Sequence, residues 1–333
     1  MMHVLSILSL IAFTAASPVP SIDENPRVLE HRAVIVTAQD LSNFRFYLQH
    51  ADAAYCNFNT AVGKPVHCGA GNCPDIEKDA AIVVGSVVGT KTGIGAYVAT
   101  DNARKEIVVS VRGSINVRNW ITNFNFGQKT CNLVAGCGVH TGFLDAWEEV
   151  AANIKAAVSS AKTANPTFKF VVTGHSLGGA VATVAAAYLR KDGFPFDLYT
   201  YGSPRVGNDF FANFVTQQTG AEYRVTHGDD PVPRLPPIVF GYRHTSPEYW
   251  LDGGPLNKDY TVSEIKVCDG IANVMCNGGT IGLDILAHIT YFQSMATCAP
   301  IAIPWKRDVS DEELDKKLTK YSEMDQEFVK QMT

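Results

Sequence analysis

Apolar residues follow two different patterns along the middle of the chain. Short runs rich in Val, Ile and Phe predict buried strands, and longer segments with apolar residues three or four positions apart predict helices. Strands are expected at residues 80–88, 107–111, 168–173, 197–201, 222–226 and 261–267. Helices are expected at 144–161 and 177–190. This alternation predicts an α/β fold in which helices cover both faces of a mainly parallel central sheet.

The beginning of the chain has a different pattern. Residues 1–16 are almost wholly apolar and end in small residues, so they predict a removable signal peptide and a secreted, extracellular protein. Residues 17–32 carry prolines and charges and end at Arg32, which predicts a pro-segment. A single catalytic domain is expected over 33–305, and no later segment is apolar enough to predict a transmembrane helix.

A dibasic pair, Lys306-Arg307, precedes the charged end of the chain. Ser310 and Glu313 form a capping-box pattern, and apolar residues at helical spacing follow them. Residues 306–333 are therefore expected to be a tail outside the catalytic domain that is removed by cleavage at the dibasic pair. The pro-segment and the tail together predict that the protein is made as a zymogen.

Charge and cysteine content narrow the choice of function. The net charge of −5 gives no electrostatic reason to expect nucleic-acid binding. Eight cysteines in an exported chain predict disulfides, and no CxxC pair or suitably spaced histidine predicts a metal site. Close spacing predicts three local disulfides and leaves one pair to join the start of the domain to its end. The pairs are Cys68–Cys73, Cys131–Cys137, Cys268–Cys276 and Cys56–Cys298.

A Gly-x-Ser-x-Gly motif, Gly174 to Gly178, lies where a predicted strand ends and a predicted helix begins. The motif alone is common, but this context is not. A tight strand-to-helix turn exposes the serine hydroxyl at the carboxyl edge of the sheet, beside the positive end of a helix. Glycines at both flanks let the strand and the helix approach closely. The sequence therefore predicts Ser176 as a nucleophile.

A nucleophilic serine needs a histidine base and a carboxylate that orients the histidine. In α/β-hydrolases these follow the serine in the order acid, then histidine. Asp229 and Asp230 come directly after a predicted strand, and either could be the acid. Among the later histidines, His244 and His288 are both candidates for the base, and His288 lies in an apolar segment.

Several segments resemble the class 3 lipases secreted by filamentous fungi, and most closely those of the Fusarium type. They read YGSPRVGN at 201–208, RVTH at 224–227, DPVPRLPP at 230–237, GYRH at 241–244 and EYW at 248–250. The likeness extends over about residues 41–298 and implies an α/β-hydrolase fold.

The resemblance also assigns the roles that the residues alone leave open. It implies that Asp230 is the acid and His288 the base, and it leaves His227 and His244 with structural roles. It further implies that the backbone N–H of Leu177 and the serine of Arg-Gly-Ser, Ser114, form the oxyanion hole. Two preorganised donors on separate loops suit the developing negative charge of a tetrahedral intermediate.

The segment directly after Ser114 has the pattern of a short amphipathic helix. By itself this pattern is also typical of a surface helix packed on the core. Its position and the family resemblance imply a lid that covers an apolar acyl cleft in water and opens at a lipid surface. The predicted lid comprises Asn116, Val117, Arg118, Asn119, Trp120, Ile121 and Thr122.

These features together predict a secreted serine esterase for lipid degradation, a triacylglycerol lipase with interfacial activation and an acyl-enzyme intermediate. Triacylglycerol is the expected substrate, phospholipid a further one, and the enzyme is expected to be a monomer without metal or organic cofactor. One alternative is a soluble carboxylesterase of the feruloyl-esterase type, whose members have a more polar segment at the lid position. The other is an inactive binding protein on a hydrolase fold, because a fold alone does not establish activity.

Overall fold

The computed structural model describes residues 35–69, 71–295, 298 and 309–332. The predicted signal peptide, the pro-segment and the dibasic pair lie outside these residues. The helices are α1 (Ala38–Asn57), α2 (Pro74–Asp79), α3 (Val117–Thr122), α4 (Thr141–Ala164), α5 (Leu177–Lys191), α6 (Asp209–Gln217), α7 (Ile285–Ile289) and α8 (Asp311–Met332). Among these residues, no helix is both long enough and apolar enough to cross a lipid bilayer.

One eight-stranded sheet forms the centre of the fold, in the order β1-β2-β3-β6-β7-β8-β9-β10. Its strands are β1 (Ile82–Val88), β2 (Gly95–Asp101), β3 (Glu106–Val111), β6 (Lys169–His175), β7 (Phe196–Tyr201), β8 (Glu222–His227), β9 (Glu248–Leu251) and β10 (Ile265–Cys268). The pairs from β3 to β9 are parallel, whereas β1, β2 and β10 add to the sheet in antiparallel pairs. A separate antiparallel pair consists of β4 (Gln128–Thr130) and β5 (Gly138–His140).

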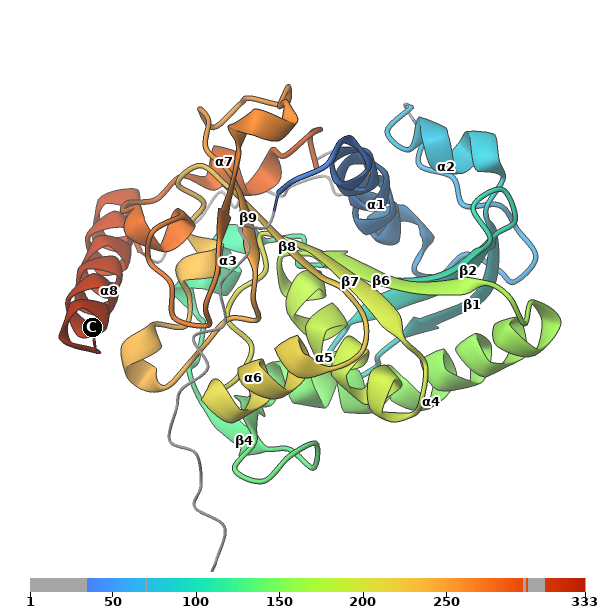
Figure 1. Ribbon diagram of the computed structural model, residues 1–333, viewed down its shortest axis with the longest axis horizontal. Helices are drawn as coiled ribbons and strands as arrows, with labels where there is room; N and C mark the ends of the chain where they lie inside the picture. Colours follow the sequence, from blue (N-terminus) through green and yellow to red (C-terminus); the bar gives the residue numbers. More distant parts are fainter. Residues whose placement is uncertain (1–34, 70, 296–297, 299–308, 333) are drawn as a thin grey trace, which may run out of the picture. The chain divides into compact units, whose positions relative to one another are not determined.

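Helices cover both faces of the sheet, as the sequence predicts (Figure 1). Alternate residues of the central strands point to opposite faces. Val108 and Val171 pack in the core that includes α1, and Val109 and Val172 pack in the core that includes α4 and α5. Because β3, β6, β7 and β8 run parallel, their carboxyl ends lie on one edge of the sheet. The loops that follow β3, β6 and β8 can meet at this edge.

Two differences from the expected elements have physical causes. The segment predicted as a strand over 261–267 begins with a 3-10 turn, Val262–Glu264, because the side chain of Glu264 accepts a hydrogen bond from the backbone N–H of Thr261, 2.7 Å away. Only its last part joins the sheet, as β10. The long helix α1 gives little apolar periodicity because its buried face includes polar side chains, among them Gln49, His50 and Asp52.

Four disulfides connect parts of the fold, and they are the four pairs that the spacing predicts. Three of these disulfides each close a loop of only a few residues. The fourth, Cys56–Cys298, joins residues 242 positions apart and ties the end of α1 to the segment after α7. A cross-link over so long a loop restricts the unfolded chain more than a local one does.

Candidate active site

The turn between β6 and α5 places Ser176 at the N-terminal end of α5. Ser176 has a positive φ of 58°, which is uncommon for a residue with a side chain. The glycines on either side make this turn possible, because a Cβ on Gly174 would overlap the carbonyl group of Gly178. The backbone N–H of Ser176 donates a 2.9 Å hydrogen bond to the carbonyl oxygen of Tyr201, so the turn is fixed to the adjacent strand β7.

Asp230 and His288 form a fully buried pair. Asp230 follows β8, and His288 lies in the short helix α7, whose N-cap Asp284 accepts a hydrogen bond from the N–H of Ala287. The two carboxylate oxygens of Asp230 lie 2.8 and 2.9 Å from Nδ1 of His288. A proton held on Nδ1 by the carboxylate leaves Nε2 free to accept another proton. Asp229, the other candidate acid, has an exposed side chain.

The residue before Ser176 packs against His288. The ring of His175, the residue before Ser176, lies 4.6 Å from the ring of His288. Ser176 is fully buried, and among the described residues neither its Oγ nor Nε2 of His288 has a hydrogen-bond partner. The structure therefore brings the predicted nucleophile, acid and base to one edge of the sheet and shields them from water.

Three other histidines hold the backbone around this pair. His175 lies 2.8 Å, through Nε2, from the carbonyl oxygen of His288, and His227 lies 2.9 Å, through Nδ1, from that of Ala287. Nε2 of His244 lies 2.7 Å from the carbonyl oxygen of Pro233. Burial lowers the pKa of His175 to about 3, so this ring is neutral in the folded protein. These contacts match the structural roles that the family resemblance implies for His227 and His244.

Two residues of the site were not predicted from the sequence. The hydroxyl of Tyr291 donates a 2.8 Å hydrogen bond to Oδ2 of Asp230. Gly202, directly after β7, has a φ of +57°, and a Cβ there would lie 2.8 Å from the same oxygen. The signal for Tyr291 was its spacing of three residues from His288 at the end of a helix. The sequence around Gly202 gives no signal of its role, because the residues that a Cβ there would contact are distant in the chain.

The two predicted oxyanion-hole residues lie on adjacent loops. Ser114 follows β3 and Leu177 follows β6, and these strands are paired in parallel with Val111 opposite Gly174. The Oγ of Ser114 accepts a hydrogen bond from the N–H of Asn116, 3.3 Å away. The loop after Ser114 is thereby folded back toward the start of α3.

The predicted lid forms the helix α3, with Asn116 as its N-cap. The side-chain oxygen of Asn116 accepts a hydrogen bond from the N–H of Asn119, 3.1 Å away. Val117 and Ile121 are buried, and the half-buried ring of Trp120 lies 4.1 Å from the ring of Phe124. The apolar face of α3 is thus turned into the molecule, as expected of either a closed lid or a packed surface helix.

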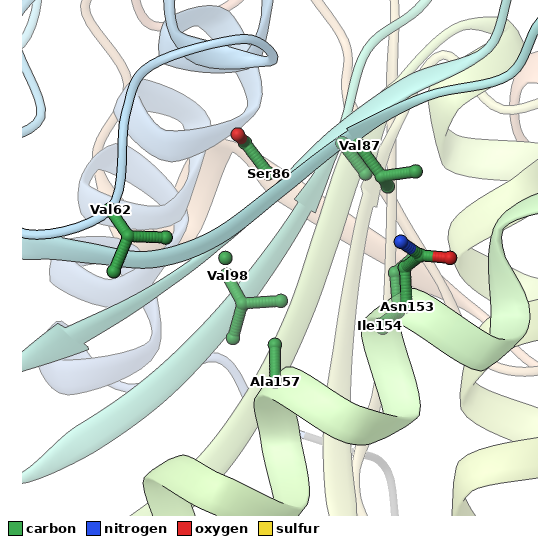
Figure 2. Close-up of a pocket in the computed structure, with 9 residues that line it drawn as sticks. Val62, Ser86, Val87, Val98, Asn153, Ile154 and Ala157 are labelled. Carbon is green, nitrogen blue, oxygen red and sulfur yellow. The ribbon is translucent and has the colours of Figure 1, made fainter.

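A pocket of about 190 Å³ lies far from this site, between β1, β2 and α4. Figure 2 shows that Val98, Ile154 and Ala157 are among the side chains that line it. Its lining includes none of the predicted site residues. Ser176 itself is fully buried in this arrangement.

The strand–serine–helix turn and the buried Asp–His pair, set on the edge of a mainly parallel sheet, define a serine hydrolase with the α/β-hydrolase fold. Comparisons with known proteins agree with this class. A model of the lipase (class 3) family matches residues 108–240.

Individual relatives extend the likeness over the whole chain. The secreted mono- and diacylglycerol lipase 1 of Fusarium solani is 96% identical over 333 residues, which cover all of both chains. The secreted mono- and diacylglycerol lipase A of Penicillium camembertii is 40% identical over 304 residues, 89% of this chain and 98% of that one. The crystal structure of a mono- and diacylglycerol lipase from Aspergillus oryzae matches with a TM-score of 0.74 and 40% identity, over 79% of this chain and 99% of the other. The chain belongs to the class 3 lipase family.

Proposed function

We propose that this lipase hydrolyses acylglycerol esters, triacylglycerols among them, through an acyl-enzyme intermediate on Ser176. The observation that carries the proposal is the fully buried pair of Asp230 and His288 beside a serine at the strand-to-helix turn. The Fusarium and Penicillium relatives are named mono- and diacylglycerol lipases, which supports acylglycerols as the substrate class.

In the first half of the reaction, Oγ of Ser176 attacks the carbonyl carbon of the ester while Nε2 of His288 takes the hydroxyl proton. Asp230 holds Nδ1 of His288 and stabilises the imidazolium that forms. Donors at Ser114 and Leu177 stabilise the oxyanion of the tetrahedral intermediate. When the intermediate collapses, His288 returns the proton to the leaving alcohol, and the acyl group stays on Ser176.

In the second half, His288 takes a proton from a water molecule, which attacks the acyl carbon. The second tetrahedral intermediate releases the fatty acid, and the proton returns to Ser176. Besides the ester and the water molecule, the residues named above supply every group that these steps use.

The segment α3 acts as a lid in this proposal. It begins three residues after Ser114, its apolar side chains face inward, and Ser176 is fully buried in this arrangement. Moving α3 aside would expose apolar surface, which is costly in water and favourable at a lipid surface. This argument favours a lipase over a soluble esterase of the feruloyl-esterase type.

Three further properties belong to the same proposal. The relative from Fusarium solani is described as secreted, which supports export through the predicted signal peptide. Phospholipids carry the same carboxylic ester bonds as acylglycerols and are proposed as additional substrates. The enzyme is proposed to act as a monomer, because all the proposed catalytic groups come from one chain.

The proposal is tested by measuring the rate of ester hydrolysis as the ester concentration crosses its solubility limit. The wild-type enzyme should show a sharp rise in rate when emulsion droplets form. Ser176→Ala should lose activity on the order of 10⁴-fold or more on both dissolved and emulsified ester, because the proposed catalytic residues act as a unit. Retained activity in Ser176→Ala would refute the nucleophile, and a smooth rate curve without a rise would favour the soluble esterase.

A further inference from the structure

The C-terminal helix α8 packs directly against the lid. Leu314 and Leu318, in the first turns of α8, are 1% and 3% exposed. They share one apolar cluster with Val117 and Ile121 of the lid. In Figure 1, α8 stands at the end of the molecule opposite β1 and β2. The inward face of the lid is therefore covered partly by a segment that the sequence alone describes as a separable tail.

An ion pair between the lid and the beginning of α8 adds to this contact. Arg118 donates through Nε and a terminal nitrogen to Oδ1 of Asp311, at 2.9 and 2.7 Å. Its terminal nitrogen also donates to the carbonyl oxygen of Val309, 2.6 Å away. Partly exposed ion pairs contribute little stability by themselves, but several hydrogen bonds from one guanidinium fix geometry. Arg118 thus sets the position of the lid relative to the beginning of α8.

The rest of α8 is anchored on the body of the enzyme. Asp325 forms a 2.8 Å ion pair with Arg205, and both side chains are 2% exposed. The other carboxylate oxygen of Asp325 accepts a 3.2 Å hydrogen bond from the N–H of Val239, and the hydroxyl of Ser322 lies 3.0 Å from a guanidinium nitrogen of Arg234. Breaking a buried ion pair leaves an uncompensated charge, so this anchor resists separation.

We propose that α8 is a latch that holds the lid closed over Ser176 in the full-length chain. The inference rests on the proposed function of α3 as a lid and adds a regulator to it. Because α8 is anchored at Asp325, it cannot follow the lid, and opening must separate Val117 and Ile121 from Leu314 and Leu318. The same movement must break the pair between Arg118 and Asp311.

If α8 is a latch, the predicted cleavage at the dibasic pair changes how firmly the lid is held. Residues 306 and 307 lie outside the described residues but come directly before the latch in the sequence. Cleavage there would turn an intramolecular contact into a contact between two chains, whose strength then depends on concentration. The full-length chain is the restrained form of the enzyme, and loss of the latch releases the lid.

The test measures how fast a soluble aryl phosphonate labels Ser176 in the absence of lipid. Leu314→Ser combined with Leu318→Ser in the full chain removes the apolar contact with the lid and keeps the anchor at Asp325. We expect labelling to become at least about tenfold faster, because the closed state loses its contact and the open fraction rises. The matched control is Met324→Ser with Met332→Ser, which changes two exposed residues of the same helix and should leave labelling unchanged.

A charge reversal guards against the possibility that the leucine variant is misfolded. Arg118→Asp should speed labelling, and adding Asp311→Arg should slow it again toward the wild-type rate. Recovery in the double variant supports the latch, since a general loss of structure would not be repaired by a second change. Equal labelling of the wild type and the leucine variant, or no recovery on charge reversal, would overturn the latch.

These outcomes can be separated from a failure of the proposed function. If labelling of Ser176 does not abolish hydrolysis, the proposed mechanism itself fails. If lid variants show the expected preference for dissolved ester while the latch variants label like the wild type, the lid stands and only the latch is wrong.

Discussion

Tyr291 donates its hydroxyl hydrogen to Oδ2 of Asp230 at 2.8 Å, and both side chains are fully buried. The same oxygen lies 2.8 Å from Nδ1 of His288, so the tyrosine helps to hold the carboxylate in position for the histidine. The proposed catalytic residues are therefore supported by a side chain that has no direct contact with the ester in the proposed reaction.

Replacing Tyr291 with Phe should lower kcat on a dissolved short-chain ester by about 10- to 100-fold. A hydrogen bond to a charged group is worth roughly 1.5–3 kcal/mol, and its loss lets the carboxylate turn away from His288. Tyr260→Phe is the matched control, because its buried hydroxyl lies 2.9 Å from Nε2 of His227 instead. Similar losses in both variants would show that removal of any buried hydroxyl causes the effect.

The two adjacent aspartates should behave very differently. Asp230→Asn should reduce kcat on the order of 10⁴-fold, because an amide no longer holds His288 in the tautomer that accepts the serine proton. Asp229→Asn should have little effect, since its side chain is exposed. Steady-state kinetics on one dissolved ester compares them, and equal losses would contradict the assignment of the acid.

Gly202→Ala should disable the site without a change in any proposed catalytic side chain. The added Cβ would lie 2.7 Å from the hydroxyl of Tyr291 and 3.0 Å from Cε1 of His288, and the backbone there has a positive φ. We expect a loss of kcat of at least about 100-fold, because misplacement of catalytic groups by about 1 Å is enough. Gly254→Ala, where no atom lies within 4 Å of the new Cβ, should be nearly silent. Full activity in Gly202→Ala would refute this account of the packing.

The lid is tested by Trp120→Ser combined with Ile121→Ser. These changes remove apolar surface that α3 would present to lipid, so activity on emulsified triacylglycerol should fall at least about tenfold more than activity on a dissolved short ester. Asn119→Ser, on the exposed side of α3, is the control. Equal losses on both substrates would identify α3 as a packed core helix.

Asp52 should make stability depend on pH. Burial raises its pKa to about 7, so the folded chain binds this proton more tightly than the unfolded chain does. The resulting stabilisation is present below the unfolded pKa of 3.8 and is lost as the pH rises through about 7. The whole difference corresponds to roughly 4 kcal/mol. Urea unfolding of the wild type and Asp52→Asn from about pH 4 to about pH 8 should therefore show the variant gaining relative stability as pH rises. A pH-independent difference would refute the raised pKa.

Local sequence determines the nucleophile turn. Residues 168–190 contain a buried strand, two glycines that permit close approach and a helix that starts at once, so neighbouring residues alone place Ser176 at the edge of the sheet. The Cys pairs with short spacing are predictable for the same reason, because a few residues between two cysteines leave few other partners. The α/β class follows from the alternation of strands and helices.

Other features depend on contacts between segments that are far apart in the chain. Asp230, and not Asp229, lies beside His288, because the turn after β8 directs the side chain of Asp230 inward and that of Asp229 outward. The periodicity of the sequence does not show which of the two aspartates faces inward. The role of Gly202 follows from distances across the sheet edge, for which local sequence contains no signal. The spacing of Tyr291 from His288 is visible in the sequence, but its hydrogen bond to Asp230 is not.

The C-terminal helix shows most clearly the difference between what the sequence predicts and what only the tertiary structure determines. Apolar spacing and a capping box predict the helix of residues 311–332, and charge makes it look like a solvated tail. The tertiary structure adds Asp325 paired with Arg205 and Leu314 packed on the lid. A helix with one apolar face has to bury that face against another part of the protein. The sequence pattern shows the apolar face but does not show which segment packs against it. Only the fold, by bringing α3 and α8 together, determines that the partner includes the lid.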